Sequence, residues 1–189
     1  MLFRGFKSWC ENTSIQVRAD LGVDPHDPLR PDALAQYLDV ILLKPDEIPG
    51  LSSAALKILE TEEKGSWSAV MVSVNGREAV IYNSTHSPAR RTSDIMHELA
   101  HIIKGHRPSS IMLSHTGKIA LRGYDKAHED EAGWLAGCLL LPRPALVWIR
   151  RHKMSSGLAC KRYEVSRDLL LYRMRMTGVD KQFGRASGF

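Results

Sequence analysis

The pentapeptide His97-Glu98-Leu99-Ala100-His101 lies in the most strongly patterned segment of this 189-residue chain. Apolar residues flank it at helical spacing: Ile95, Met96, Ile102 and Ile103. We therefore expect a helix from about Ser93 to Lys104 with one face in the core. Thr92 or Ser93 is suited to be its N-cap, and Gly105 is suited to end it. Such a helix would hold both histidines in fixed positions relative to the core.

Two histidines four positions apart on a helix project from the same face. His97 and His101 can therefore each offer one ring nitrogen to a single zinc ion, at about 2.0–2.1 Å. Glu98 is turned by about 100° from His97, so we expect it to act on a water beside the metal, not as a ligand. The alternative is a helix whose two histidines are unrelated. A third ligand elsewhere in the chain would decide between the two.

An acidic cluster opens a second predicted helix, from about Lys126 to Leu141, and supplies candidates for the third ligand. The helix dipole alone explains many acidic helix starts. Glu131, however, shares its face with apolar residues: Leu135, Cys138 and Leu139. A carboxylate that points into the core needs a partner, and a metal ion is a suitable one. Because Glu129 faces elsewhere, the pattern predicts Glu131 as the third ligand, with Glu129 as the alternative carboxylate.

The rest of the chain predicts a mixed α+β fold. Two β-branched runs, at 67–74 and 77–83, flank Asn75-Gly76, a dipeptide typical of a two-residue hairpin turn. Further elements are expected over these ranges: helix at 7–21, helix at 31–38 and strand at 40–43. The pattern at 51–65 is ambiguous, and its alanine and leucine residues favour a helix.

The C-terminal part of the chain is basic, since residues 143–189 hold 11 Lys and Arg against three acidic residues. Within it, Leu158 to Val179 predicts a helix, a turn and a second helix capped by Ser166. A helix-turn-helix remnant would direct three arginines toward phosphate or an acidic partner: Arg167, Arg173 and Arg175. The alternative is that both helices only pack on the preceding domain and the charge aids solubility.

Composition excludes several classes of protein. With 43% hydrophobic and 25% charged residues, the chain does not belong to the disordered class. No apolar run reaches the roughly 20 residues of a membrane span, and the N-terminus lacks the apolar core of a secretory signal. The three cysteines form no CxxC pair, so we expect a reducing, cytoplasmic location and no membrane partner.

The two patterned helices together resemble the ImmA/IrrE-type zinc metallopeptidases. That family has HELGH followed, after roughly 20–40 residues, by ExEAN-x-FA-xx-LLMP. Here the first motif is HELAH, and residues 129–142 read EDEAGWLAGCLLLP without a break in spacing. The departures are Ala100 for Gly, Gly133 for Asn, Leu135 for Phe and Leu141 for Met. Gly133 matters most, because a side chain that supports the site could be missing and glycine weakens a helix.

The resemblance, which covers roughly residues 10–180, implies a zinc endopeptidase. It implies a gluzincin-like set of three ligands, His97, His101 and Glu131, with Glu98 as the general base. Zinc would be the cofactor, with Mn²⁺ as an alternative. The fold would be a zincin-like core with a small antiparallel sheet and two central helices, at 1–145. A basic helical segment resembling a helix-turn-helix, at 146–189, would pack on it.

Members of this family typically cleave a helix-turn-helix repressor, so such a repressor or an antitoxin is the expected substrate. Two other functions stay open. The first is a metal-stabilised protein that binds a repressor or antitoxin without cleaving it, for which Glu98 would have no use. The second is a DNA-binding regulator that uses the basic C-terminal segment, and it is the least favoured of the three.

Overall fold

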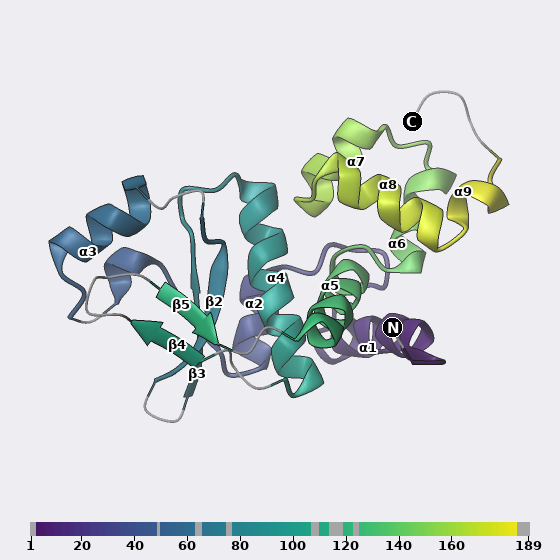
Figure 1. Cartoon of the computed structure of the whole chain (residues 1–189). Coiled ribbons are helices and arrows are strands. Elements are labelled where there is room, and N and C mark those ends of the chain that lie inside the picture. Colours follow the sequence, from purple (N-terminus) through teal and green to yellow (C-terminus); the bar gives the residue numbers. More distant parts are fainter. Residues whose placement is uncertain are drawn as a thin grey trace.

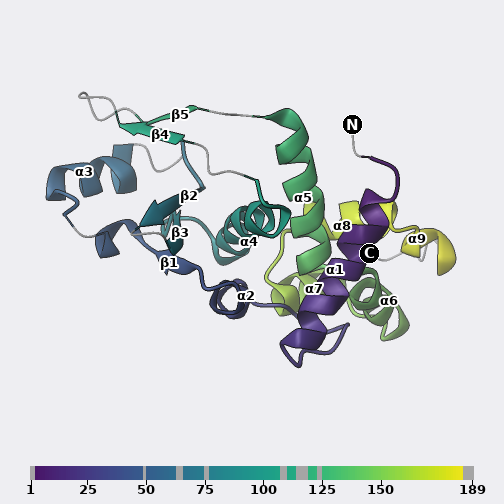
Figure 2. The same cartoon turned by 90° about the horizontal axis from the view of Figure 1, so that it is seen from below.

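The computed structural model describes residues 3–48, 50–62, 66–74, 77–106, 110–113, 119–122 and 125–184. In these residues the chain has the mixed α+β architecture that the sequence predicts. Helix α4 (Pro88–Lys104) lies between a small sheet and the other large helices, with α5 (Lys126–Leu140) packed along its far side (Figures 1 and 2). The two predicted central helices are therefore neighbours.

The main sheet has three strands in the order β1-β3-β2. Its strands are β1 (Ile41–Leu43), β2 (Ala69–Val74) and β3 (Arg77–Tyr82). Strands β2 and β3 are antiparallel with Val74 opposite Arg77, which confirms the predicted hairpin, although Asn75-Gly76 lies outside the described residues. Strand β1 runs parallel to β3. A second antiparallel pair, β4 (Ser110–Leu113) and β5 (Ile119–Arg122), was not predicted.

The N-terminal helices lie close to their predicted positions. Helix α1 covers Phe6–Asp20 and α2 covers Pro31–Tyr37, each within a residue or two of the expected range. Proline at the first helical position suits α2, because the missing N–H would have no helical partner there. Further short elements follow: the 3₁₀ turn η1 (Pro45–Glu47), α3 (Ser53–Lys57) and the π turn η2 (Ile58–Glu62).

Helix α4 begins earlier than the sequence analysis expected. Its N-cap is Ser87, whose hydroxyl accepts a hydrogen bond from the helix, and Pro88 occupies the first helical position. The prediction of a start at Ser93 is therefore wrong, because the Ser-Pro pair is the stronger start signal. Gly105 ends the helix as predicted, with φ of 68° in the left-handed region.

Helix α5 is followed by four further helices: α6 (Arg143–Arg151), α7 (Ser156–Tyr163), α8 (Arg167–Met176) and α9 (Val179–Gln182). The predicted helix, turn and helix correspond to α7 and α8, and the Ser166 hydroxyl accepts a hydrogen bond from Leu169 N at 3.1 Å. Within the described residues no single helix is long and apolar enough to cross a membrane. Helices α5 and α6 meet that requirement only when taken together, with a bend of 41° between them.

One hydrophobic core joins the C-terminal helices to the rest of the chain. Leu99 of α4 and Leu139 of α5 belong to the same buried cluster as Ile149 of α6 and Leu170 of α8. The helices after α5 are therefore packed on the part of the chain that carries the two histidines.

The C-terminal end of α5 is buried, and side chains from α1 satisfy its carbonyl groups. Ser14 Oγ donates to the carbonyl of Cys138 at 2.8 Å, and Arg18 Nη2 donates to that of Leu139 at 2.7 Å. Burial lowers the pKa of Arg18 to about 10, although nearby acidic groups oppose this shift. Helix ends leave four carbonyls without helical partners, so these two side chains fix α5 against α1.

Arg173 of α8 completes this arrangement. Its Nε donates to the carbonyl of Leu141 at 3.1 Å, and its Nη2 lies 2.5 Å from Glu11 Oε1. The side chain is only 1% exposed. The expectation that Arg173 contacts phosphate or an acidic partner is therefore wrong, because its donors serve the protein interior. Arg167 and Arg175 are exposed, and for them that role stays a prediction.

Candidate metal centre

Two histidine rings from α4 and one glutamate from α5 place their metal-binding atoms close together. His97 Nε2 and His101 Nε2 lie 3.1 Å apart. Glu129 Oε2 lies 3.0 Å from the first of these nitrogens, and Oε1 lies 3.5 Å from the second. Among the described residues, these three side chains form a group able to hold a metal ion.

The spacing of these atoms fits a zinc ion. Ligand atoms about 2.0–2.1 Å from a tetrahedral zinc ion lie roughly 3.3–3.4 Å from one another. The separations here, 3.0, 3.1 and 3.5 Å, bracket that value. Two imidazoles and one carboxylate also form a donor set typical of catalytic zinc sites, which keep one coordination position open. The residues present therefore fit the metal that the sequence predicts.

The carboxylate in this group is that of Glu129, whereas the sequence predicted Glu131. Glu131 does point inward, as predicted, but it contacts other groups there. Its Oε2 lies 3.0 Å from Lys104 Nζ and 3.3 Å from His106 Nε2. The structure thus corrects the predicted ligand set, since Glu131 is already engaged by a cation and a histidine.

The sequence around Glu129 carries a signal that favours it as the ligand. Three and seven positions after it come Ala132 and Ala136, which share its helical face and are both buried. Small residues on a buried helix face allow a close approach of the neighbouring helix. That neighbour is α4, whose histidines the Glu129 carboxylate reaches.

Glu98 occupies the position on α4 expected of a general base. Burial, the charge of Glu129 and, to a smaller extent, that of Asp94 together raise the pKa of its carboxyl to about 8, against the opposing effect of a hydrogen bond from the backbone of Met71. Glu98 therefore lies close to the Glu129 carboxylate and against strand β2. In the protein without metal, this environment favours a protonated carboxyl at neutral pH.

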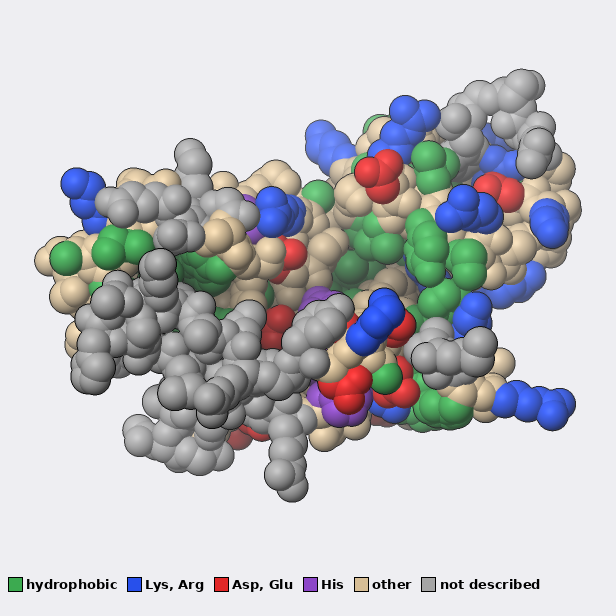
Figure 3. Space-filling model, viewed as in Figure 1, with side chains coloured by type: hydrophobic (Ala, Val, Ile, Leu, Met, Phe, Trp, Pro, Cys, Tyr) green, Lys and Arg blue, Asp and Glu red, His purple; other side chains and the backbone are tan. Residues whose placement is uncertain are grey.

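The ring of His101 is held in its neutral form. Burial lowers the pKa of His101 to about 4, and the neighbouring His97 contributes in the same direction. A neutral imidazole has a free lone pair, which metal binding requires. His101 is only 8% exposed, whereas the side chains of His97 and Glu129 are 29% and 33% exposed. One side of the group is therefore accessible, and histidine and acidic side chains reach the surface between α4 and α5 (Figure 3).

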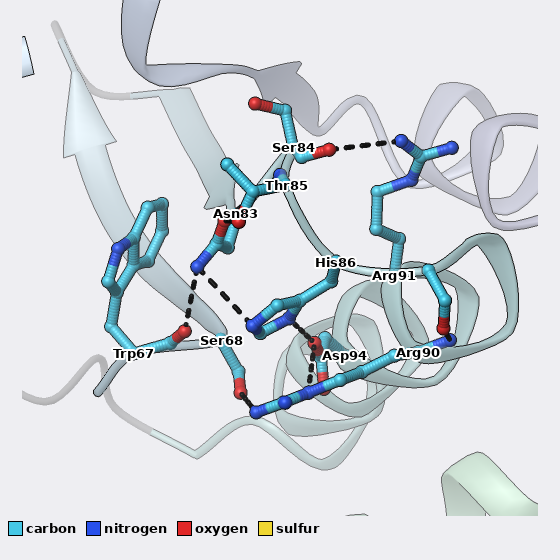
Figure 4. A network of polar contacts seen from close by, with 10 residues as sticks. Trp67, Ser68, Asn83, Ser84, Thr85, His86, Arg90, Arg91 and Asp94 are labelled. Atoms are coloured by element: carbon cyan, nitrogen blue, oxygen red, sulfur yellow. Dashed lines mark hydrogen bonds and ion pairs between the residues drawn. The ribbon is translucent and has the colours of Figure 1, made fainter. Parts of the chain in front are cut away.

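A polar network fixes the start of α4 against the sheet (Figure 4). His86 Nδ1 lies 2.9 Å from Asp94 Oδ2, and Asn83 Nδ2 lies 3.4 Å from His86 Nε2. Asn83 also donates to the carbonyl of Trp67 at 3.1 Å, next to β2. The network links the chain after β3 to the first turns of α4, so the helix is positioned without help from a ligand. None of these residues was predicted from the sequence to belong to the site.

Comparisons with known proteins bear on the family and the fold. The sequence profile of the family Peptidase M78, described as the IrrE N-terminal-like domain, matches residues 57–175. No curated protein matches the chain in sequence. A solved structure described as a Mycobacterium tuberculosis transcriptional regulator is similar over 88% of this chain, with a TM-score of 0.55 and 15% identity. The match spans 46% of that regulator's length, and at this identity the similarity shows the fold alone.

Proposed function

This chain belongs to the ImmA/IrrE family, and on that premise we propose that it is a zinc-dependent endopeptidase. The ligands in this proposal are His97, His101 and Glu129. The observation that carries it is the triangle of two Nε2 atoms and one carboxylate at zinc-ligand spacing. Glu98, on the turn of α4 between the two histidines, adds a carboxylate that a purely structural metal site would not need.

Zinc bound at this triangle would supply a water of lowered pKa and polarise a peptide carbonyl. The protein side chains would hold the ion, keep α4 in position and transfer a proton. His97, His101 and Glu129 hold their donor atoms toward one point, and the network around His86 keeps α4 in place. The Glu98 carboxylate would accept a proton from the attacking water and return it to the nitrogen of the departing amine.

The substrate in this proposal is a helix-turn-helix repressor or an antitoxin. Its support is the resemblance of the two motifs to the ImmA/IrrE peptidases. A partner of this kind would present an extended segment to the exposed side of the metal group.

Metal content tests the ligand set. Purified wild-type protein reconstituted with zinc should hold about one ion per chain, and His97→Ala and Glu129→Gln should each lose most of it. Asp130→Asn serves as the matched control, because it removes the charge of an exposed carboxylate that lies between the two glutamates on the same helix. Loss of zinc from Glu131→Gln together with retention in Glu129→Gln would contradict the assignment. A wild-type protein that binds no zinc would refute the proposal that the chain is a zinc-dependent endopeptidase.

Cleavage tests the reaction. Candidate repressors and a mixed peptide library would be incubated with zinc-loaded wild type and Glu98→Gln, and new N-termini would be identified by mass spectrometry. We expect fragments with the wild type only, while both proteins retain zinc. If the two proteins bind a repressor equally and neither cleaves it, the chain is a binding partner. A salt-sensitive complex with duplex DNA that Arg175→Glu abolishes would instead support the DNA-binding regulator.

A further inference from the structure

The metal-facing histidine His101 has a second partner on its opposite side. Its Nδ1 lies 2.9 Å from Nδ1 of His106, the second residue after α4. The other nitrogen of His106, Nε2, lies 3.3 Å from Glu131 Oε2. The side chain of His106 is 7% exposed, so this contact is inside the protein. The group at His97, His101 and Glu129 is thus extended by two further side chains on the Nδ1 side of His101.

The protons along this chain of contacts can be assigned from the chemistry of each atom. A neutral His101 that offers the Nε2 lone pair to a metal carries its proton on Nδ1. That proton can be donated only to an acceptor, so His106 Nδ1 must be unprotonated. A neutral His106 then carries its proton on Nε2 and donates it to Glu131. Each contact has one donor and one acceptor, and the direction runs from His101 to the carboxylate.

The far end of the chain is anchored by Lys104. Its Nζ lies 3.0 Å from Glu131 Oε2, which keeps the carboxylate charged and in place as an acceptor. The same ammonium group lies 5.0 Å from the ring centre of Phe6 and 4.9 Å from that of Trp9, both on α1. The Lys104 side chain is 16% exposed and that of Glu131 18%. Helices α1, α4 and α5 therefore all contribute to holding the acceptor.

We propose that His106 and Glu131 are positioning residues for the metal ligand His101. They fix its ring orientation and keep the Nε2 lone pair free toward the metal. Metal-ligating histidines commonly donate their second ring N–H to an acceptor that sets the tautomer and raises the basicity of the ligand. Here the acceptor is a second histidine backed by a carboxylate. This inference rests on the proposed zinc site, and it gives Glu131 a role without making it a ligand.

His128 provides a matched comparison for His106. The two rings are stacked with centroids 4.1 Å apart, so both belong to the same local packing. The contact recorded for the His128 ring nitrogen is with Asp125 at 3.8 Å, at the exposed start of α5. Replacing His128 by phenylalanine keeps an aromatic ring beside His106 and leaves the contact between His106 and His101 intact. An effect that came only from the packing of the two rings would appear in His128→Phe as well as in His106→Phe.

The first readout needs no metal. Protein with ¹⁵N-labelled histidine would be stripped by a chelator, and long-range ¹H–¹⁵N spectra at neutral pH would report which ring nitrogen of His101 is protonated. We expect a proton on Nδ1 in the wild type and in His128→Phe. In His106→Phe and Glu131→Ala the proton should move toward Nε2, and Glu131→Gln, which keeps an acceptor oxygen, should restore the wild-type pattern. A wild-type His101 protonated on Nε2 would overturn the proposal.

The second readout is zinc affinity, measured by competition with a chromophoric chelator. Loss of a partner behind a metal ligand typically weakens binding by about 10–100-fold, and we expect this for His106→Phe, with His128→Phe unchanged. If wild type and His106→Phe bind zinc equally and share one tautomer, the positioning role is excluded while the zinc site stands. If the wild type binds no zinc, the proposed enzymatic function is refuted. The His101 tautomer measured without metal still shows whether His101 donates a hydrogen bond to His106. Should His106→Phe not fold, Glu131→Ala and Glu131→Gln give the same comparison.

Discussion

Arg173→Met should destabilise the protein severely, because Arg173 is a buried cation that joins α8 to two other helices. Methionine keeps a long apolar side chain and removes the guanidinium. The variant loses the donor to the carbonyl of Leu141 and the cation 2.5 Å from Glu11. A buried carbonyl without a donor costs about 1–3 kcal/mol. A fully buried ion pair would add about 3–5 kcal/mol, but Glu11 is 25% exposed, so we expect about 1–2 kcal/mol from this pair.

The sum is a loss of about 2–5 kcal/mol in the free energy of unfolding, or a fall in Tm of roughly 5–15 °C for a chain of this size. Urea unfolding followed by circular dichroism would measure it. Arg175→Met is the matched control, since Arg175 is exposed on the same helix and its replacement should change stability by less than about 0.5 kcal/mol. If the two variants are equally stable, Arg173 does not secure the end of α5, and the attachment of the C-terminal helices rests on apolar packing alone.

Two further predictions concern pH and helix α5. The pKa of Glu98 is raised to about 8 from 4.5, so its contribution to stability is fully present below about pH 4.5 and is lost as the pH rises through about 8. In urea unfolding of chelator-treated protein at pH 5 and pH 8.5, wild type should therefore lose stability relative to Glu98→Gln, and parallel profiles would contradict the raised pKa. Gly133→Ala should stabilise α5 by about 0.5–1 kcal/mol, because a Cβ there meets no atom within 4 Å among the described residues. Gly137→Ala should stabilise the protein less than Gly133→Ala, or destabilise it, since its Cβ would lie 3.2 Å from Cδ of the buried Arg173. Thermal unfolding would measure both variants, and an equal rise in Tm would show that Arg173 moves to accommodate the added methyl group.

The elements that the sequence predicted well carry their signals locally. Helix α2 has proline at its first position, α8 has Ser166 as its cap, and the β2–β3 hairpin has Asn75-Gly76 between its strands. Helix α6 was not predicted from the sequence, because Pro142 and Pro144 directly follow α5 and proline ends a helix. Pro144 instead lies in the first turn of α6, where proline is equally favourable. The pair β4 and β5 was not predicted from the sequence.

The histidines of the metal centre could be predicted because their spacing within one helix fixes their geometry. The buried positions of Arg18 and Arg173 could not, because both arginines bind carbonyls that belong to a different helix and lie far away in sequence. An arginine in an amphipathic helix is usually exposed. Only the packing of α1, α5 and α8 shows that the end of α5 needs donors from outside.

The choice between Glu129 and Glu131 shows where sequence reasoning stops. Both glutamates are partly buried on α5, and inward orientation alone does not distinguish a ligand from another buried acid. The distinction depends on what each face of α5 meets. The face with Glu129 meets the histidines in the middle of α4, and the face with Glu131 meets Lys104 at the end of α4 and His106 just after it. A lysine three positions after His101 would repel a bound dication if it lay among the ligands. Its partner Glu131 neutralises it on the Nδ1 side of His101, away from the Nε2 atom that faces Glu129. In the proposed zinc site the two carboxylates would therefore take different roles for an electrostatic reason.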